Sequence, residues 1–476
     1  MAARPRSLTP TLKSGDPELA VTFDKALLAL GPFETSPRLA AAVSGGPDSL
    51  CLTLLARDWC HRHRGHLIAL TVDHGLREES RAEADQVHTW LTAEGIEHHI
   101  LTWQGKKPAT RIQAAARQAR YQLLIDWCIA HDVLHLLLGH QADDQAETII
   151  FRSHRHSGPD GLAGMAAVRD LPWIRMLRPL LSVRRETLRQ DLIKRGQDFL
   201  EDPSNIDLRF TRARLRQDID EKARREALDL AIDYAQQRQQ AEDETALFLA
   251  QATTLHPHGF ALLDPRILSS LNDHGLSMVL RRVALCIGAE DYPPRTESLD
   301  RLREWIRHNL MHHKNSQRTL AGCCWIFRPN KILVCREYIA APTFDLDPKS
   351  YALGETSKDN TDWLVWDRRF SINAMFYVNL ADGPAKIDVL GRYTHSQFLQ
   401  NLPLQKLVLP SAVKKALPII VDNQGILAIP HFGYLRPERA GYGRRMLYPA
   451  RIIQETVRFT PHHPLAPAHF CSLEQN

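Results

Sequence analysis

Short apolar runs alternate with longer amphipathic stretches over the first third of the chain. Residues 38–43 form the first apolar run, and leucines with helical spacing follow from Leu50 onwards. Strands and helices that alternate at such lengths are typical of right-handed βαβ units, so we expect an α/β fold with a doubly wound parallel sheet. The pattern predicts strands over residues 38–43, 66–73, 98–103 and 133–138, and helices over residues 78–94, 112–130 and from about Asp143.

Polar residues follow three of these predicted strands. A turn rich in serine and glycine follows the first strand, Asp73-His74-Gly75 follows the second, and Gly139-His140 follows the fourth. Ligands of open α/β sheets bind at the carboxyl ends of the strands. We therefore expect these residues to face one crevice.

The remainder of the chain predicts further domains. Arginines are frequent from residue 165 to residue 217, and the residues after 217 have helical patterns. Short runs separated by turn residues, at 363–370, 376–380 and 419–429, are typical of a small β-rich domain. We expect an α/β domain over residues 1–217 with its core at 38–217, a mainly helical domain over 218–344, a linker at 345–362 and a β-rich C-terminal domain over 363–476.

Length and composition exclude several classes of protein. The chain has 476 residues, of which 44% are hydrophobic and 24% charged, and this is typical of a globular protein with several domains. Its longest apolar runs, residues 133–139 and 417–421, are far shorter than the roughly 20 residues that span a bilayer, so we expect no membrane segment. The first residues lack the apolar core of a secretory signal, which predicts a cytoplasmic protein.

Cysteines and charge add two constraints. The eight cysteines are scattered and form no C-x-x-C pair, so we expect reduced thiols. The histidine-rich residues 61–66 have no thiol or carboxylate nearby at ligand spacing, which argues against a zinc site. The net charge of +5 permits a polyanionic partner without requiring one.

The strongest local signal is the turn after the first predicted strand. It reads Ser44-Gly45-Gly46-Pro47-Asp48-Ser49. A glycine pair lets the backbone approach an anion, and the helix start supplies oriented N–H groups, so the turn predicts phosphate binding. The chain has no Walker A sequence with its lysine, and Asp48 instead indicates a magnesium ion on a departing pyrophosphate. The alternative is an ordinary glycine turn with a serine N-cap.

A second group of polar residues follows the fourth predicted strand. It contains His140 and three carboxylates, Asp143, Asp144 and Glu147. If a helix begins near Asp143, then Asp143 and Glu147 share one helix face. The alternative explanation is that the helix dipole favours acidic residues in any first turn.

Two groups of arginines could bind phosphates. Arg117 and Arg120 lie one turn apart on the predicted helix 112–130 and could clamp one phosphate or carboxylate. Arg212, Arg214 and Arg216 form a strip of alternate arginines suited to RNA or nucleotide phosphates. A solvated helix face is the alternative in both cases.

These motifs resemble, in their order, those of the tRNA(Ile)-lysidine synthetase family of the N-type ATP pyrophosphatase superfamily, whose PP-loop reads SGGxDS. Ordered agreement of this kind is far more specific than a lone glycine motif. The chain departs from the family pattern at Ala213, where asparagine is usual, at Gln141, where a second histidine is usual, and at His156, where glycine is usual. The agreement covers residues 38–217 through the segments 44–49, 72–77, 116–121, 139–148, 157–165, 178–181 and 202–205.

The resemblance implies an ATP-dependent ligase that acts on tRNA(Ile) with a CAU anticodon. ATP and Mg²⁺ would bind at the PP-loop, and the C2 oxygen of the wobble cytidine would attack the α-phosphate and release pyrophosphate. The amino group of L-lysine would then displace AMP from the adenylated cytidine and give lysidine. The resemblance also implies a homodimer, and we expect the middle and C-terminal domains to grip the tRNA.

The resemblance also implies roles for particular residues. Residues Ser44, Gly45, Gly46, Pro47, Asp48 and Ser49 would bind ATP. Asp48 and Asp144 would hold Mg²⁺, with a lysine-orienting role as the alternative for Asp144. Asp143 and Glu147, together with Asp144, would provide negative charge for the ammonium groups of lysine. The catalytic candidates are Asp48, Asp144, Arg117, Arg120, Arg212 and Arg216.

Other functions stay open from the residues alone. A tRNA thiolation enzyme on the same scaffold would need reactive cysteines, and no C-x-x-C pair occurs. An amide-forming relative would carry a glutaminase domain, but no cysteine occurs in the first fifty residues. A non-catalytic RNA-binding protein is suggested by Ala213 and by the basic residues Lys414, Lys415, Arg436, Arg439, Arg444 and Arg445.

Overall fold

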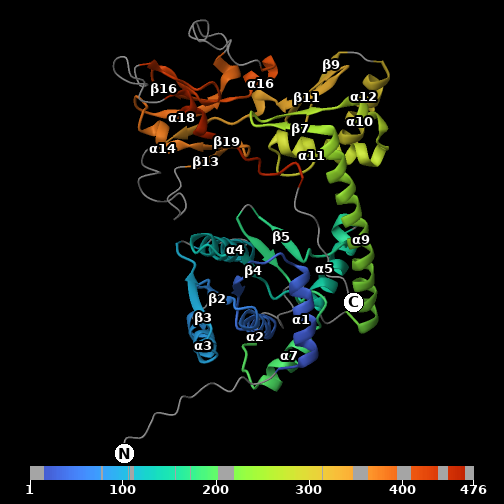
Figure 1. Cartoon of the computed structure of the whole chain (residues 1–476), viewed down its shortest axis with the longest axis vertical. Coiled ribbons are helices and arrows are strands. Elements are labelled where there is room, and N and C mark those ends of the chain that lie inside the picture. Colours follow the sequence, from blue (N-terminus) through green and yellow to red (C-terminus); the bar gives the residue numbers. More distant parts are fainter. Residues whose placement is uncertain are drawn as a thin grey trace, which may run out of the picture. The chain divides into compact units, whose positions relative to one another are not determined.

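The central apolar runs near the start of the chain become buried strands, because helices cover both faces of the sheet that the strands form (Figure 1). The run expected at 98–103 lies in the edge strand Glu97–Thr102, which is only partly buried. The structure divides into two compact units, with the boundary between Glu242 and Asp243. The structure is a computed structural model, and it describes residues 15–76, 79–105, 107, 112–155, 157–171, 173–201, 219–312, 315–346, 363–393, 409–437 and 449–466.

The first unit contains a six-stranded sheet in the order β3-β2-β1-β4-β6-β5. All neighbouring strands are parallel except β5, which runs antiparallel to β6. The chain moves outward from β1 to β3 and then returns to β4 on the other side of β1, so the direction of winding changes between β1 and β4. Ligand sites of such sheets lie at this point. The strands are β1 (Arg38–Ala42), β2 (His66–Asp73), β3 (Glu97–Thr102), β4 (His135–Leu137), β5 (Val168–Asp170) and β6 (Arg175–Leu177).

Alternate residues of the central strands face different helices. Leu39 and Ala41 of β1 pack with α1, α2, α3 and α7, whereas Ala40 and Ile68 pack with α4 on the opposite face. This arrangement confirms the expected doubly wound α/β fold. The helices of this unit are α1 (Pro17–Ala29), α2 (Pro47–Arg62), α3 (Glu79–Ala93), α4 (Ile112–Ala130), α5 (Ala142–His154), α6 (Pro159–Leu162), α7 (Arg185–Arg195) and the first part of α9 (Glu221–Ala252).

The second unit begins with an antiparallel sheet in the order β7-β8-β11-β10-β9. Apolar side chains of α11 and α12 pack with Trp325 and Phe327 of β10 to form its core. The sequence pattern predicts the helices of this region but none of its strands. The elements are β7 (Thr253–His256), β8 (Phe260–Leu263), α10 (Pro265–Ser270), α11 (Asp273–Gly288), α12 (Thr296–His312), β9 (Ser316–Leu320), β10 (Cys323–Arg328) and β11 (Lys331–Arg336).

Two further antiparallel sheets confirm the β-rich character of the C-terminal region. Their strand orders are β12-β15-β16-β17-β18 and β13-β14-β19. Their strands are β12 (Phe344–Leu346), β13 (Trp363–Trp366), β14 (Phe370–Asn373), β15 (Ala385–Val389), β16 (Pro418–Asp422), β17 (Gly425–Ile429), β18 (Tyr434–Leu435) and β19 (Val457–Phe459). The short helices are η2 (Tyr338–Ala340), α14 (Ala374–Val378), η3 (Leu390–Tyr393), α16 (Ser411–Lys415), η5 (Pro430–Phe432) and α18 (Ala450–Glu455).

One expectation for this region is wrong, and another is described at only two of its residues. The apolar run at 376–380 is not a strand, because most of it lies in α14, where the Asn373 side chain caps the helix by accepting a hydrogen bond from the Phe376 backbone N–H. The expected linker at 345–362 starts inside β12, where Asp345 pairs with Lys386. Its remaining residues, 347–362, lie outside the described residues, and the domain boundaries stay predictions.

None of the helices in the described part of the chain combines the length and the apolar character needed to cross a bilayer.

A buried ion network joins α1, α2 and α7 of the first unit. The Arg195 side chain donates to Asp191 Oδ2 at 2.7 Å and to Asp58 Oδ2 at 2.9 Å, and the Asp16 backbone N–H donates to Asp191 Oδ1 at 2.6 Å. Asp191 is fully buried and Arg195 nearly so. The network therefore fixes α7, which carries a residue of the site described below.

We predict that Asp191→Ala in the full chain lowers the free energy of unfolding of the first unit by about 3–5 kcal/mol, because it removes the fully buried one of the two carboxylates that pair with the buried Arg195 charge. Arg81→Ala removes an exposed ion pair with Asp85 on α3 and should change the free energy of unfolding by no more than about 0.5 kcal/mol. Hydrogen-exchange mass spectrometry of α2 and α7 in increasing urea measures both values. Equal effects of the two substitutions would contradict the prediction.

Candidate functional site

The turn between β1 and α2 is closed by its own hydroxyl groups. Ser49 Oγ accepts a hydrogen bond from the Ser44 backbone N–H at 3.1 Å and donates one to the Gly46 carbonyl at 3.0 Å. Gly45 has a φ of +84°, and a Cβ there would lie 2.5 Å from Leu200 Cδ1. Only glycine fits this position without strain. The turn is therefore preformed, and its shape depends on Gly45 and Ser49.

The start of α2 provides donors for an anion. The helix begins at Pro47, and its N-cap, Gly46, makes no side-chain cap hydrogen bond. The first intrahelical bond runs from the Leu50 N–H to the Gly46 carbonyl, so the N–H groups of Asp48 and Ser49 have no acceptor within the helix. Together with the helix dipole, these groups favour a phosphate at this end.

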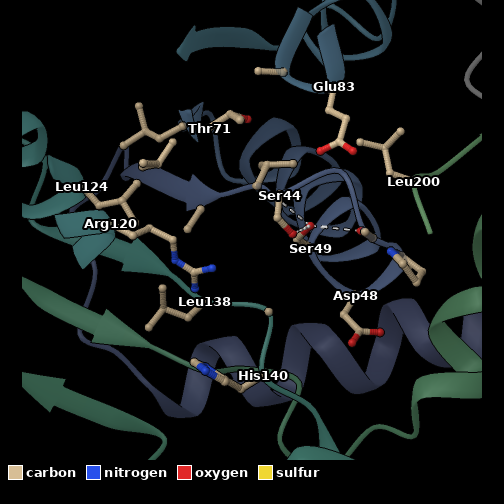
Figure 2. A pocket seen from close by; sticks show the side chains of 18 of the residues that line it. Ser44, Asp48, Ser49, Thr71, Glu83, Arg120, Leu124, Leu138, His140 and Leu200 are labelled. Atoms are coloured by element: carbon tan, nitrogen blue, oxygen red, sulfur yellow. Dashed lines mark hydrogen bonds between the residues drawn. The ribbon is translucent and has the colours of Figure 1, made fainter. Parts of the chain in front are cut away.

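A cavity of about 540 Å³ lies at this end of the sheet, where β1, β2 and β4 end. Figure 2 shows Asp48, Glu83 and Arg120 around the turn that carries Ser44 and Ser49. The expected common crevice therefore exists. Its polar lining comprises Ser44, Asp48, Ser49, Thr71, His74, Ser80, Glu83, Arg120, His140, Asp144 and Arg185.

The second strand contributes to the cavity less directly than expected. Asp73 Oδ1 accepts hydrogen bonds from the Gly75 N–H at 2.9 Å and from Ser80 Oγ at 2.6 Å, so Asp73 shapes the turn into α3. Thr71 and His74 line the cavity instead. Behind Thr71, the His98 ring approaches Thr71 Oγ1 at 2.8 Å, and burial lowers the pKa of His98 to about 4. His98 is therefore neutral at physiological pH and supports the wall of the cavity.

Close packing at Gly139 brings the start of α5 against the start of α2. A Cβ on Gly139 would lie 3.1 Å from Ser49 Cα and 3.2 Å from the Ser49 nitrogen. The Gln141 and Asp144 side chains then form a capping box at the first turn of α5. This places Asp144 in the lining of the cavity.

Two charged residues of the lining were not predicted from the sequence, Glu83 on α3 and Arg185 in the first turn of α7. Arg185 lies among the site carboxylates. Its guanidinium lies 3.1 Å from Asp144 Oδ1, 3.5 Å from Asp48 Oδ2 and 3.8 Å from Glu147 Oε1. The sequence showed it only as one of many arginines between residues 165 and 217, although it closely follows the segment 178–181 of the family pattern.

Asp48 is a partly buried carboxylate with a raised pKa. Burial is the main cause that raises the pKa of Asp48, and the nearby Asp144 also raises it, whereas Arg185 and Gln141 lower it. The result is a pKa of about 6 for Asp48, against an ordinary value of 3.8. Its Oδ1 atom is buried and accepts no hydrogen bond from the described residues. An oxygen in this state is suited to a cation.

The two carboxylates fit Mg²⁺ in the way that nucleotide-dependent enzymes use it. Mg²⁺ is commonly held by one or two carboxylates together with the phosphates of the substrate. Asp48 and Asp144 lie on the same cavity and share Arg185 as a neighbour. Within the described ranges, no group of three or more His, Cys, Asp or Glu side chains is arranged to hold a metal ion, and this includes residues 61–66.

Asp143 does not line the cavity and is engaged elsewhere. Its Oδ2 atom accepts a hydrogen bond from the Arg185 backbone N–H at 2.9 Å, and its Oδ1 atom lies 3.0 Å from Arg224 Nε. Asp143 thus provides an acceptor for the first turn of α7 and anchors α9. Glu147 is buried beneath the cavity, beside Arg185.

The arginine pair of α4 is divided by the structure. Arg120 lines the cavity, and its Nε atom is buried without a hydrogen-bond partner among the described residues. Arg117 is exposed, does not line the cavity and donates to the Tyr121 hydroxyl at 3.3 Å. The structure therefore brings Asp48, Asp144 and Arg120 together, whereas Arg212 and Arg216 lie outside the described residues.

Comparison with known proteins identifies relatives of this arrangement. A family model described as a PP-loop domain matches residues 19–223. A tRNA(Ile)-lysidine synthase of Brucella anthropi is 37% identical and covers 81% of this chain and 83% of its own length. A tRNA(Ile)-lysidine synthase of Orientia tsutsugamushi is 28% identical, and the match covers 93% of this chain and 96% of the relative. Among solved structures, the U34-tRNA thiolase NcsA from Methanococcus maripaludis aligns with a TM-score of 0.41 and 18% identity over 46% of this chain and 80% of its own.

The raised pKa of Asp48 predicts a pH-dependent effect of Asp48→Asn. In the unfolded chain Asp48 ionises near pH 3.8, whereas in the folded chain it keeps its proton until about pH 6. Its ionisation therefore destabilises the wild type as pH rises from about 4 to 6, and asparagine avoids this loss. We expect the variant to be more stable at pH 7.5 by at most about 3 kcal/mol, from about 1.4 kcal/mol per pKa unit.

Urea unfolding of both proteins at pH 4 and pH 7.5 measures this difference. The advantage of the variant should largely disappear at pH 4, where Asp48 of the folded wild type is protonated. An advantage of equal size at both pH values would show that it does not arise from the carboxylate charge.

Proposed function

This chain belongs to the tRNA(Ile)-lysidine synthase family, and we propose that its cavity at the carboxyl ends of β1, β2 and β4 is where ATP, the wobble cytidine and lysine react. The protein is an ATP-using ligase that forms lysidine on tRNA(Ile). One observation supports the location of the site above all others. The PP-loop start of α2, the carboxylates Asp48 and Asp144 and the Arg120 guanidinium line one cavity.

The first step is the adenylation of the cytidine. The C2 oxygen of the wobble cytidine attacks the α-phosphorus of ATP, and the bond to the β-phosphate oxygen breaks to release pyrophosphate. The N–H groups of Asp48 and Ser49 hold the pyrophosphate portion, because they lack acceptors within α2. Arg120 stabilises the negative charge that develops on the α-phosphate.

The second step is the transfer of lysine. The lysine amino group attacks C2 of the adenylated base, the bond to the AMP oxygen breaks, and the amine loses a proton. We assign the recognition of a lysine ammonium group to Asp144 at the cavity surface, with Glu147 buried behind it. Asp143 is left out of this assignment because it is bound to α7 and α9.

Mg²⁺ would be held by Asp48 and Asp144. When bound, it neutralises charge on the phosphates and on the leaving pyrophosphate. The chain itself contributes the buried Asp48 oxygen that lacks a hydrogen bond in the described structure.

The cavity chemistry favours a ligase over a thiolation enzyme. Sulfur transfer needs an accessible thiolate. In the described part of the chain no cysteine lines the cavity, and burial beside Asp191 raises the pKa of Cys51, on α2, far above its ordinary value.

The basic residues outside the cavity are assigned to tRNA binding. Arg117, Arg212 and Arg216 contact tRNA phosphates, and the second unit, with Lys414 and Lys415, binds the body of the CAU-anticodon tRNA. Arg436 is left out of this assignment because it is buried and paired with Asp422 at 2.6 Å. We place the enzyme in the cytoplasm, where its tRNA substrate is found. A homodimer stays a prediction that sedimentation can test.

The reaction is tested by incubating the protein with ATP, Mg²⁺, radiolabelled lysine and a tRNA(Ile) transcript with a CAU anticodon. We expect label on the wobble nucleoside after nuclease digestion, and none with a transcript that carries a GAU anticodon. Asp48→Ala should release no pyrophosphate with the CAU transcript. Unlabelled tRNA that nevertheless binds tightly would favour the non-catalytic RNA-binding alternative.

The two arginines of α4 should differ in their effects. Arg120→Ala should lower kcat for pyrophosphate release by about 100-fold, because it removes a donor to the developing phosphate charge. Arg117→Ala should chiefly weaken tRNA binding and reduce the slope of log affinity against log salt by about 1. Single-turnover kinetics and filter binding at several salt concentrations measure these values, and identical effects would contradict the division of roles.

A further inference from the structure

The three carboxylates that lie beside Arg185 come from two helices, and Arg185 itself comes from a third. Asp48 belongs to α2, Asp144 and Glu147 belong to α5, and Arg185 belongs to α7. Arg185 Nη2 lies 3.1 Å from Asp144 Oδ1, and Arg185 Nε lies 3.5 Å from Asp48 Oδ2. Without a cation between them, like charges on Asp48 and Asp144 would push the two side chains apart.

The guanidinium is the group that can bridge both helices at once. It is planar, and its N–H donors point in fixed directions, whereas a lysine ammonium is a single point of charge on a flexible stem. Here Nε faces Asp48, while Nη2 faces Asp144 and, at 3.8 Å, Glu147 Oε1. The bridge therefore sets both the distance and the relative orientation of the two carboxylates.

The backbone of Arg185 is itself fixed. Its N–H donates to Asp143 Oδ2 at 2.9 Å, and Asp143 Oδ1 lies 3.0 Å from Arg224 Nε on α9. Glu221, also on α9, accepts hydrogen bonds from Arg184 at 2.6 Å and from Arg224 at 2.7 Å. This anchor cluster of Asp143, Arg184, Glu221 and Arg224 limits the movement of the Arg185 backbone, from which the side chain extends.

We propose that Arg185 is a positioning residue of the ligase reaction. Its guanidinium holds Asp48 and Asp144 in the arrangement that receives Mg²⁺ and lysine, and the anchor cluster holds Arg185 in place. This inference rests on the proposed function of the two carboxylates. Arg185 acts on the reaction only by positioning Asp48 and Asp144. Asp143 belongs to the anchor cluster and does not contact the substrate.

The test compares Arg185→Ala with Arg185→Lys and with a matched control, Arg189→Ala. Arg189 lies one turn further along α7, does not line the cavity and pairs with the exposed Glu201 at 3.2 Å. For Arg185→Ala we expect kcat for pyrophosphate release to fall about 10- to 100-fold, the size of effect seen when a supporting partner of a ligand residue is removed. KM for ATP and for tRNA should change less than about threefold, because the PP-loop donors stay in place.

Chemical rescue distinguishes positioning from a general effect on the fold. Added guanidinium chloride, at concentrations well below those that unfold the protein, should restore part of the kcat of Arg185→Ala but not raise that of the wild type or of Arg189→Ala. Arg185→Lys should have an intermediate kcat that guanidinium does not improve. The thermal midpoint of each variant and its Mg²⁺-dependent binding of ATP, measured by calorimetry without tRNA, provide readouts independent of turnover.

Each outcome is decisive for the inference. A raised KM for ATP with an unchanged kcat would make Arg185 a phosphate-binding residue and overturn the positioning role. A fall in kcat without guanidinium rescue and with a lower thermal midpoint would reduce Arg185 to a structural residue and overturn it as well. Failure of the wild type to label tRNA would instead refute the proposed function, so the two failures are distinguishable.

Discussion

The starts of three helices converge at one edge of the parallel sheet, and this constraint governs what the site contains. α2 and α5 each follow a strand of a βαβ-type succession, and α7 begins beside α5, where the Ala142 N–H donates to the Val183 carbonyl at 2.9 Å. Each helix start carries partial positive charge and N–H groups without intrahelical acceptors. Asp48 and Asp144 place negative charge at the starts of α2 and α5. Asp143 accepts a hydrogen bond from the Arg185 N–H in the first turn of α7. The same edge therefore offers donors for phosphates and carboxylates for cations.

Much of the fold was predictable where one pattern persisted over enough residues. β2 and α4 have the lengths that the sequence predicts, because seven consecutive buried residues of one and the long amphipathic stretch of the other leave little ambiguity. The β7–β8 hairpin was missed because each strand has four residues, too few for alternation to stand out. The segment 376–380 was misassigned because a short aromatic run fits a strand and a helix equally well, and the cap at Asn373 decides between them.

The site was predictable where a residue's role follows from the motif that contains it. Asp48 and Asp144 stand next to helix starts, so their place at the strand ends follows from the succession of elements. Arg185 could not be found this way, because its role depends on how α7 meets α5 in space. Asp143 was assigned to lysine because the sequence does not determine which side chains of a helix face the cavity. One residue turns a side chain by about 100°, which separates Asp143, facing α7 and α9, from Asp144, facing the cavity.

Asp48 illustrates how the fold accepts a local loss of stability for the sake of the site. Its burial raises its pKa to about 6, and its Oδ1 atom is left without a hydrogen bond in the described structure. A second arginine or a backbone donor beside Oδ1 would stabilise the ionised carboxylate, but it would also occupy the position that a cation needs. The single guanidinium of Arg185 faces three carboxylates, those of Asp48, Asp144 and Glu147. In the proposed reaction, the negative charge of these carboxylates would attract Mg²⁺ and the lysine ammonium, and Asp48 Oδ1 would be available to the ion.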